Sequence, residues 1–377
     1  MTETGAEVDR VDAEEQLELT EQEQEDLDAA EAQAQFVSYS GQDFDVAGLI
    51  RRLENDDILI PSFGHADERI EAQGFQRSFV WNRPQMDRFI ESLLLGYPIP
   101  GIFLVRQTDN RYLVLDGQQR LSTLRAFKEG LHNSREFALK NVADELKGLT
   151  YKTLPEDLRR KFDNTFIQAI LVSSDGSPKS LDSVYNIFER LNSGGTQLTA
   201  HEIRVALYAG PFIDYIEGLN RFEAWRDLYG KRSPRLRDQE LVLRILALFH
   251  SSKDYKRPLK KFLNDFVSAH RSADNLPLEC LKTLFKKAAS LMVEQSGRAA
   301  IRLRGNQVNA ALTEAVFFGL MKRLDSDAPA PTAAEVDEVI ESYKENEAIY
   351  EALTRSTADE DQVTKRLTAA VAAFMGD

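Results

Sequence analysis

One short segment brings together residue types that suit anion chemistry: residues 113–124, which read LVLDGQQRLSTL. An apolar run typical of a strand is followed by an amphipathic helix pattern, and between them stand Asp116, Gly117, Gln118, Gln119 and Arg120. Gly117 lets the backbone turn sharply and lets a ligand approach closely. The unpaired N–H groups of the first helical turn, together with the Arg120 guanidinium, can hold a phosphate. The segment therefore predicts a phosphate site.

The other polar side chains of this segment can assist hydrolysis. Asp116 can orient a water molecule, accept a proton or coordinate Mg²⁺. Gln118 and Gln119 offer uncharged amides that can position a nucleophilic water. The alternative is structural, because Asp-Gly is a common turn pair and an arginine in a first helical turn often contacts only solvent. The chain has no Walker A loop and no Gly-x-Gly-x-x-Gly after a strand.

The elements around the segment predict an α+β domain. Apolar, β-favouring runs indicate extended segments at 58–60, 75–80, 102–106, 112–115 and 166–172. The polar Thr108-Asp109-Asn110 between two of them predicts a hairpin. Helical periodicity with capping signals indicates helices at 46–53, after Asn82, after Gly117, at 181–191 and after a Thr199–Glu202 capping box.

Beyond residue 212 the strand signals vanish and only helical patterns remain. They fall at 241–249, 259–266, 278–293, 308–324, 333–343 and 364–374. We therefore expect an acidic disordered tail over 1–35, an α+β domain over 36–212 and an all-helical domain over 213–377.

The negative charge of the chain is concentrated at its start. Residues 1–35 hold thirteen acidic residues and one arginine, and thus carry most of the net charge of −14. Such a segment, without aromatic residues, cannot bury enough apolar area to offset its ordering entropy. It is interpreted as a solubilising tail, with a nucleic-acid mimic or a partner-binding tail as alternatives. The nearly neutral remainder can carry local basic patches.

Composition excludes several classes of protein. The single cysteine, Cys280, excludes an internal disulfide framework and a cysteine-based zinc cluster. The first residues lack the positive start and apolar run of a secretory signal. No window of 18 apolar residues is present, so we expect no membrane span. The single cysteine predicts a reducing, cytoplasmic location.

A basic stretch at 226–261 carries eleven Lys/Arg against four Asp/Glu. Aromatic residues at 225, 229 and 255 lie among these charges and could stack on bases. The alternative is a set of solvated helix faces. If the stretch contacts DNA, affinity should fall steeply with salt. The predicted DNA-binding residues are Lys231, Arg232, Arg235, Arg237, Lys256, Arg257, Lys260 and Lys261.

Several motifs occur together in one order and spacing. Gln76-Arg77 with Phe79 and Trp81 precede Tyr97-Pro98-Ile99-Pro100, then residues 115–124, and later FERLNSGGT at 188–196 with Leu198 and Glu202. Over roughly residues 45–210 the chain resembles the N-terminal domain of GmrSD-type modification-dependent restriction proteins, the DGQQR-motif family.

The resemblance implies a small ParB/sulfiredoxin-like mixed sheet with helices, in which a Gly-x-x-Arg turn binds nucleotide phosphates. It also implies hydrolysis of a nucleoside triphosphate, with Mg²⁺, and a role in DNA restriction or antiphage defence. The catalytic residues would be Asp116, Gln118, Gln119 and Arg120, with Asp116 as the metal ligand. The nucleotide-binding residues would be Gln76, Arg77, Gly117, Arg120, Glu189, Arg190 and Asn192.

The loop from Asn192 to Thr196 has two readings. It is either a plain interhelical turn with Asn192 as C-cap, or a segment that closes over the nucleotide. The resemblance favours the second reading.

Two functions follow. The first is a hydrolase that couples nucleotide turnover to DNA engagement and is a candidate DNA endonuclease. The second is a non-catalytic module that senses nucleotide or DNA and acts through a separate nuclease. The second is favoured by the lack of a recognisable HNH motif, since none of the five histidines has the required spacing. Oligomerisation is possible in either case.

Overall fold

The residues described by the computed structural model are 38–60, 81–107, 109–191, 198–303 and 305–376. The chain divides into two compact units between Leu198 and Thr199, called here the N-terminal unit and the helical unit. The sequence patterns predict the boundary after residue 212. The difference lies in α8 (Ala200–Leu207), because His201 bonds to Gln239 and Arg204 bonds to Asn264, both in the helical unit.

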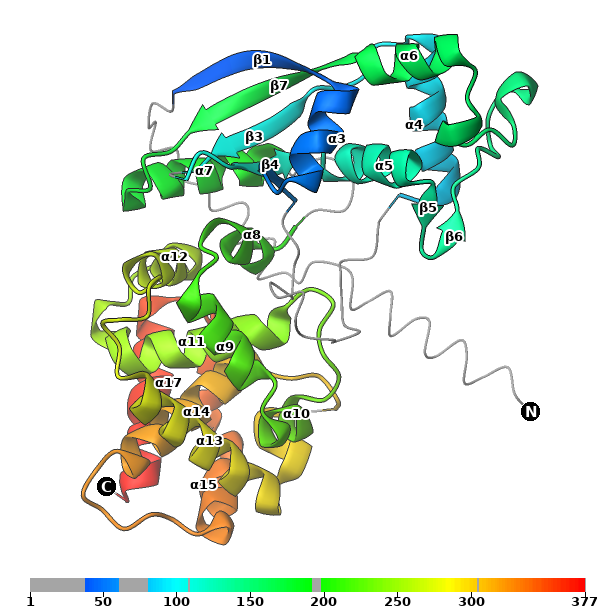
Figure 1. The fold of residues 1–377 in the computed structure, drawn as a ribbon. Helices are drawn as coiled ribbons and strands as arrows, with labels where there is room; N and C mark the ends of the chain where they lie inside the picture. Colours follow the sequence, from blue (N-terminus) through cyan, green and yellow to red (C-terminus); the bar gives the residue numbers. More distant parts are fainter. Residues whose placement is uncertain (1–37, 61–80, 108, 192–197, 304, 377) are drawn as a thin grey trace, which may run out of the picture. The chain divides into compact units, whose positions relative to one another are not determined.

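A five-stranded mixed sheet forms the centre of the N-terminal unit (Figure 1), and this confirms the α+β fold class. β3 and β4 form the predicted antiparallel hairpin, and their register shifts between Phe103 and Leu104, where β4 ends. β7 pairs parallel with β3 and antiparallel with β1, and β2 pairs parallel with β4. The order across the sheet is β1 (Tyr39–Asp45), β7 (Phe166–Ser173), β3 (Ile102–Arg106), β4 (Tyr112–Asp116) and β2 (Ile58–Leu59).

Helices cover both faces of this sheet. Val114 belongs to the main core of the unit, whereas its neighbours Leu113 and Leu115 are buried outside that core. α7 (Pro178–Leu191) packs against β4 and covers the second face, since successive side chains of a strand point to opposite faces. The main core is shared with α3 (Val46–Glu54), α4 (Arg83–Leu95), α5 (Gln118–Glu129) and α6 (Glu156–Asn164).

Local signals placed several elements correctly. Asn82 caps α4 through a capping box with Gln85, and Thr199 caps α8 in the same way with Glu202.

β1 was not predicted, because its residues are mostly exposed and polar and it is extended through its pairing with β7. Also unpredicted are α6, the hairpin of β5 (Leu131–His132) and β6 (Arg135–Glu136), and the 3₁₀ turns η1 (Asp144–Leu146) and η2 (Tyr151–Thr153). The extended segment predicted at 75–80 lies outside the described residues.

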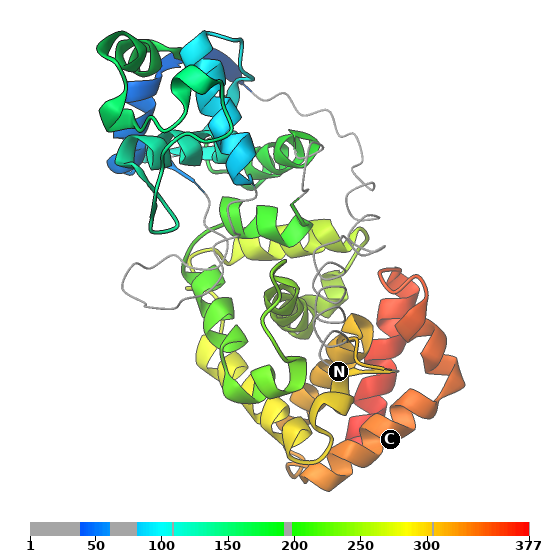
Figure 2. The same ribbon diagram turned by 90° about the vertical axis from the view of Figure 1, so that its right-hand side faces the viewer.

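The helical unit contains only helices and turns among its described residues, as expected. α14 and α17 lie side by side (Figures 1 and 2), with Gly319 against the Ala370 carbonyl. No helix in the described part of the chain is long and apolar enough to cross a membrane. After α8 the elements are α9 (Pro211–Asn220), α10 (Glu223–Tyr229), α11 (Arg237–Ser251), η3 (Ser252–Asp254), α12 (Leu259–Ala269), α13 (Leu278–Gln295), η4 (Gly297–Ile301), α14 (Ala310–Leu324), α15 (Ala333–Glu345), α16 (Glu347–Thr354) and α17 (Glu360–Met375).

A chain of buried charges runs through the helical unit. Glu240 accepts hydrogen bonds from Arg244 at 2.6 and 2.9 Å. Arg244 also lies 3.5 Å from Glu314, which accepts from Arg366 at 2.6 Å. All four side chains are at most 10% exposed. Since burying an unpaired charge is costly, each of these groups depends on its partners.

A buried histidine adjoins this chain of charges. A guanidinium can only donate, so the Arg204 Nη1 donates to His201 Nδ1 across 3.1 Å. His201 Nε2–H therefore donates to the Gln239 amide oxygen at 3.0 Å. This fixes the neutral tautomer, and burial lowers the pKa of His201 from 6.5 to about 3.

His201 makes stability depend on pH. Between pH 6.5 and about 3 the unfolded chain binds a proton at this residue that the folded chain excludes, so stability falls as the pH falls. From pH 7 to 5 we expect this residue alone to remove about 2 kcal/mol from the free energy of unfolding. Urea titrations of the wild type and of His201→Gln at both pH values measure it. Equal losses in the two proteins would contradict the assignment.

Candidate functional site

The strand–turn–helix predicted to bind phosphate is formed by β4, Gly117 and α5. The last apolar residues of β4 are buried, and Asp116 is the final residue of the strand. Gly117 follows with φ 98° and ψ 9°, in the left-handed region, and α5 begins at Gln118. A Cβ on Gly117 would lie 2.5 Å from Ile102 Cγ2. Both the backbone conformation and the available space therefore require glycine.

Replacing Gly117 by alanine should open this turn. The positive φ costs about 1–2 kcal/mol for an L-residue, and the contact with Ile102 adds an overpacking cost of about 1–3 kcal/mol. We expect a lower melting temperature and a loss of ligand binding, both measurable by thermal unfolding with and without nucleotide. Gly130→Ala is the matched control, because Gly130 ends the same helix with φ 76° but has open space at its Cβ. If the melting temperature fell equally in Gly117→Ala and Gly130→Ala, the contact with Ile102 would not contribute to the loss.

The Arg120 guanidinium is held inside the turn. Its Nη2 donates to the Gly101 carbonyl at 2.9 Å and to Asp116 Oδ2 at 2.5 Å. The Arg120 side chain is 13% exposed, whereas that of Asp116 is 45% exposed. Arg120 Nε is buried and has no hydrogen-bond partner among the described residues. The site thus has a positioned cation, a half-exposed carboxylate and one unsatisfied donor.

The two glutamines of the turn are not equivalent. Gln119 Oε1 accepts a hydrogen bond from the Trp81 backbone N–H at 3.2 Å, which ties residue 81 to the start of α5. Trp81 in turn packs edge-on against Phe89 of α4. Gln118, the first residue of α5, is half-buried. Of the two amides predicted to position water, Gln119 is engaged in holding the turn together.

The first turn of α5 has no side-chain cap and no acidic residue. Its N-cap is Gly117, whose carbonyl accepts from Leu121 N–H at 2.9 Å and which has no side chain to cap the helix. No carboxylate lies in the first helical turn. The N–H groups of this turn and the positive end of the helix dipole therefore stand beside Arg120.

The remaining predicted nucleotide-binding residues are distributed differently. Glu189 and Arg190 lie near the end of α7, where Glu189 is buried and Arg190 is exposed. Gln76, Arg77 and Asn192 lie outside the described residues. The structure therefore brings together the turn residues 116–120 and leaves the contribution of the others a prediction.

The basic stretch at 226–261 does not form one basic surface. Arg235 is buried, 3.4 Å from the Glu202 carboxylate, and Lys260 is buried as well. Side chains this inaccessible do not reach a phosphate backbone, so these two residues are removed from the predicted DNA contacts. Burial of Trp225 and Tyr255 likewise removes them as surfaces for base stacking.

Three of the six other predicted DNA contacts are already in ion pairs. Arg232 pairs with Glu217, Arg257 with Asp359 at 2.7 Å and Lys261 with Asp265 at 3.0 Å. Arg237 is half-buried at the start of α11. Lys231 and Lys256 are exposed and have no ion pair within the described part of the chain. The sequence shows the basic residues of the stretch, but it does not show the carboxylates that the fold brings next to them.

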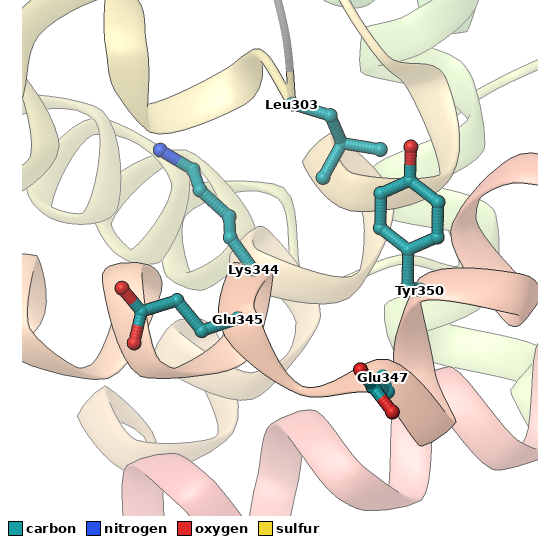
Figure 3. Close-up of a pocket in the computed structure, with 5 residues that line it drawn as sticks. All are labelled: Leu303, Lys344, Glu345, Glu347 and Tyr350. Carbon is teal, nitrogen blue, oxygen red and sulfur yellow. The ribbon is translucent and has the colours of Figure 1, made fainter.

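A cavity of about 430 Å³ lies in the helical unit (Figure 3) and was not predicted. Lys344 Nζ at its wall donates to the Ala299 carbonyl at 2.7 Å and to Glu341 at 2.6 Å. With its one ammonium engaged and two glutamates in the lining, the cavity does not suit a phosphate. Its lining residues are Leu303, Lys344, Glu345, Glu347 and Tyr350.

The described residues offer no cluster of metal-ligating side chains. Within the described residues there is no group of three or more His, Cys, Asp or Glu side chains that could hold a metal ion. Mg²⁺ often takes one or two protein carboxylates and completes its shell with water and substrate phosphates. Asp116, a half-exposed carboxylate at the turn, is compatible with that mode of Mg²⁺ binding.

One family model matches a part of the chain that begins in the N-terminal unit and ends just after α8. The model of the family described as GmrSD restriction endonuclease, N-terminal domain, matches residues 54–209. No curated protein matches the chain. The matched range contains β4, Gly117, α5 and α7, so the site described above belongs to the family domain. The match confirms the resemblance predicted from the motifs.

Proposed function

We propose, from the membership of residues 54–209 in the N-terminal domain family of GmrSD restriction endonucleases, that this chain binds and hydrolyses a nucleoside triphosphate. The turnover would be coupled to DNA engagement in a restriction or antiphage system. The observation that carries the proposal is the largely buried Arg120 guanidinium, held by Gly101 and Asp116 at the uncapped first turn of α5. Together they supply donors and positive charge for a phosphate chain.

The residues of the turn would divide the work of hydrolysis. Arg120 and the N–H groups of α5 would hold phosphate oxygens and offset the charge that develops on them. Gln118 would position the attacking water. Asp116 would be the protein ligand of Mg²⁺ carried in with the nucleotide. Gln119 would act indirectly, since its amide oxygen holds the Trp81 backbone.

Phosphate release tests the proposal directly. The full chain is incubated with each common nucleoside triphosphate and Mg²⁺, with and without duplex DNA. We expect release from at least one nucleotide, increased by DNA and reduced by chelation of Mg²⁺. Absence of release from every nucleotide, with and without DNA, would refute hydrolysis by this chain.

A second candidate is a nucleotide- or DNA-sensing module that acts through a separate nuclease. It is favoured by the contacts that already occupy two expected catalytic groups, Gln119 on Trp81 and Asp116 on Arg120. Nucleotide that raises the melting temperature without any phosphate release identifies this function.

A further inference from the structure

The donors of Arg120 are unequally used. Both described acceptors, the Gly101 carbonyl at 2.9 Å and Asp116 Oδ2 at 2.5 Å, lie on Nη2. Nη2 carries only two hydrogens, so these contacts occupy it. Nε, on the same edge of the guanidinium, is buried without a partner among the described residues. On the edge formed by Nε and Nη2, Nη2 is therefore occupied by two acceptors, whereas Nε has no acceptor among the described residues.

A phosphate that binds the Nε and Nη2 edge of Arg120 must displace either the Gly101 carbonyl or the Asp116 carboxylate from Nη2. Arginine holds phosphate best with two adjacent N–H groups, and both such pairs of a guanidinium include Nη2. Gly101 is main chain, directly before β3 and against the Gln168 carbonyl of β7, where a Cβ on Gly101 would lie only 2.8 Å away. It has little room to withdraw. Asp116 is a half-exposed side chain that also repels an incoming phosphate.

We propose that Asp116 is an internal counter-ion that occupies Arg120 when the site is empty and that the phosphate must displace. The inference rests on the proposed function, because it concerns the same turn. The carboxylate keeps the buried guanidinium paired and competes with anionic ligands. Intrinsic affinity for phosphate is thereby lowered, and Asp116 becomes available for another role only once the ligand is bound.

Binding of inorganic tripolyphosphate in EDTA tests the exchange, because no metal ion then bridges the ligand to Asp116. Titration calorimetry on the full chain compares the wild type with Asp116→Asn, which keeps the shape and removes the charge. We expect the variant to bind roughly tenfold more tightly, since a charged competitor and a like-charge repulsion are both lost. Asp116→Glu should restore weak binding.

Glu129→Gln is the matched control. It removes one carboxylate from the same helix, where Glu129 lies 3.9 Å from Arg125 and both are about half exposed. Its affinity should stay within about twofold of the wild type because the pair is solvated. If Glu129→Gln and Asp116→Asn gained similar affinity for tripolyphosphate, the change in net charge would explain both results, and the proposal would be overturned.

The outcomes separate this inference from the proposed function. If the wild type binds, Arg120→Ala does not, and Asp116→Asn binds no more tightly than the wild type, the counter-ion role is refuted and the phosphate site stands. If Asp116→Asn alone binds detectably, the inference is supported. If no variant binds tripolyphosphate or a nucleoside triphosphate at millimolar concentration, the phosphate site itself is refuted, and the counter-ion role with it.

Discussion

Arg120→Ala should lose nucleotide affinity by about a hundredfold and lose hydrolysis with it, while the fold persists. Two charge-assisted hydrogen bonds to phosphate disappear, and together they are worth about 3 kcal/mol or more. The fold persists because Asp116, freed from the pair, is 45% exposed and can be hydrated. Isothermal titration and phosphate release measure the loss, and circular dichroism confirms the secondary structure.

Two further variants sharpen this result. Arg120→Lys keeps the charge but not the planar pair of donors, so we expect it to recover little of the lost affinity. Arg125→Ala removes an exposed arginine one turn further along α5 and should bind nucleotide normally. Hydrolysis at the wild-type rate by Arg120→Ala would exclude the turn as the nucleotide site.

Glu314→Gln should destabilise the helical unit by about 3–5 kcal/mol. The Glu314 carboxylate is 2% exposed, accepts from Arg366 at 2.6 Å and lies 3.5 Å from Arg244. The amide is similar in shape but carries no charge, so the buried Arg366 guanidinium loses its described carboxylate partner. Arg244 retains Glu240, and Arg366 therefore accounts for most of the cost.

Fluorescence can follow this loss in one unit alone. The chain has two tryptophans, Trp81 in the N-terminal unit and Trp225 buried in the helical unit. In a Trp81→Phe background, urea unfolding monitored at Trp225 reports only on the helical unit, which avoids treating two units as one transition.

Glu341→Gln is the control for Glu314→Gln. Glu341 is half exposed and pairs at 2.6 Å with Lys344, which is 12% exposed and also donates to the Ala299 carbonyl at 2.7 Å. Because Lys344 keeps this second acceptor and the removed carboxylate is solvated, its loss should cost less than about 1 kcal/mol. A Glu314→Gln variant that unfolds at the same urea concentration as this control would show that the buried charges do not depend on one another.

Much of the local structure around the site was predictable. Residues 113–120 encode a buried strand, a left-handed glycine and a helix start, and each follows from near neighbours in the chain. Capping boxes marked the starts of α4 and α8 for the same reason. β1 could not be found in this way, since its polar residues are extended through pairing with β7, over a hundred residues later.

The sequence by itself determined the similarity of residues 54–209 to the family model. It also determined the bend that carries Asp116 and Arg120, because the conformation of a turn depends on adjacent residues. Tertiary structure decided which charges are available. Arg120 meets a carbonyl 19 residues away, and Gln119 meets a backbone N–H 38 residues away. Arg235 and Lys260 are buried. Spacing does not reveal such partners, because the pairing and burial of a charge are set by elements that only folding brings together.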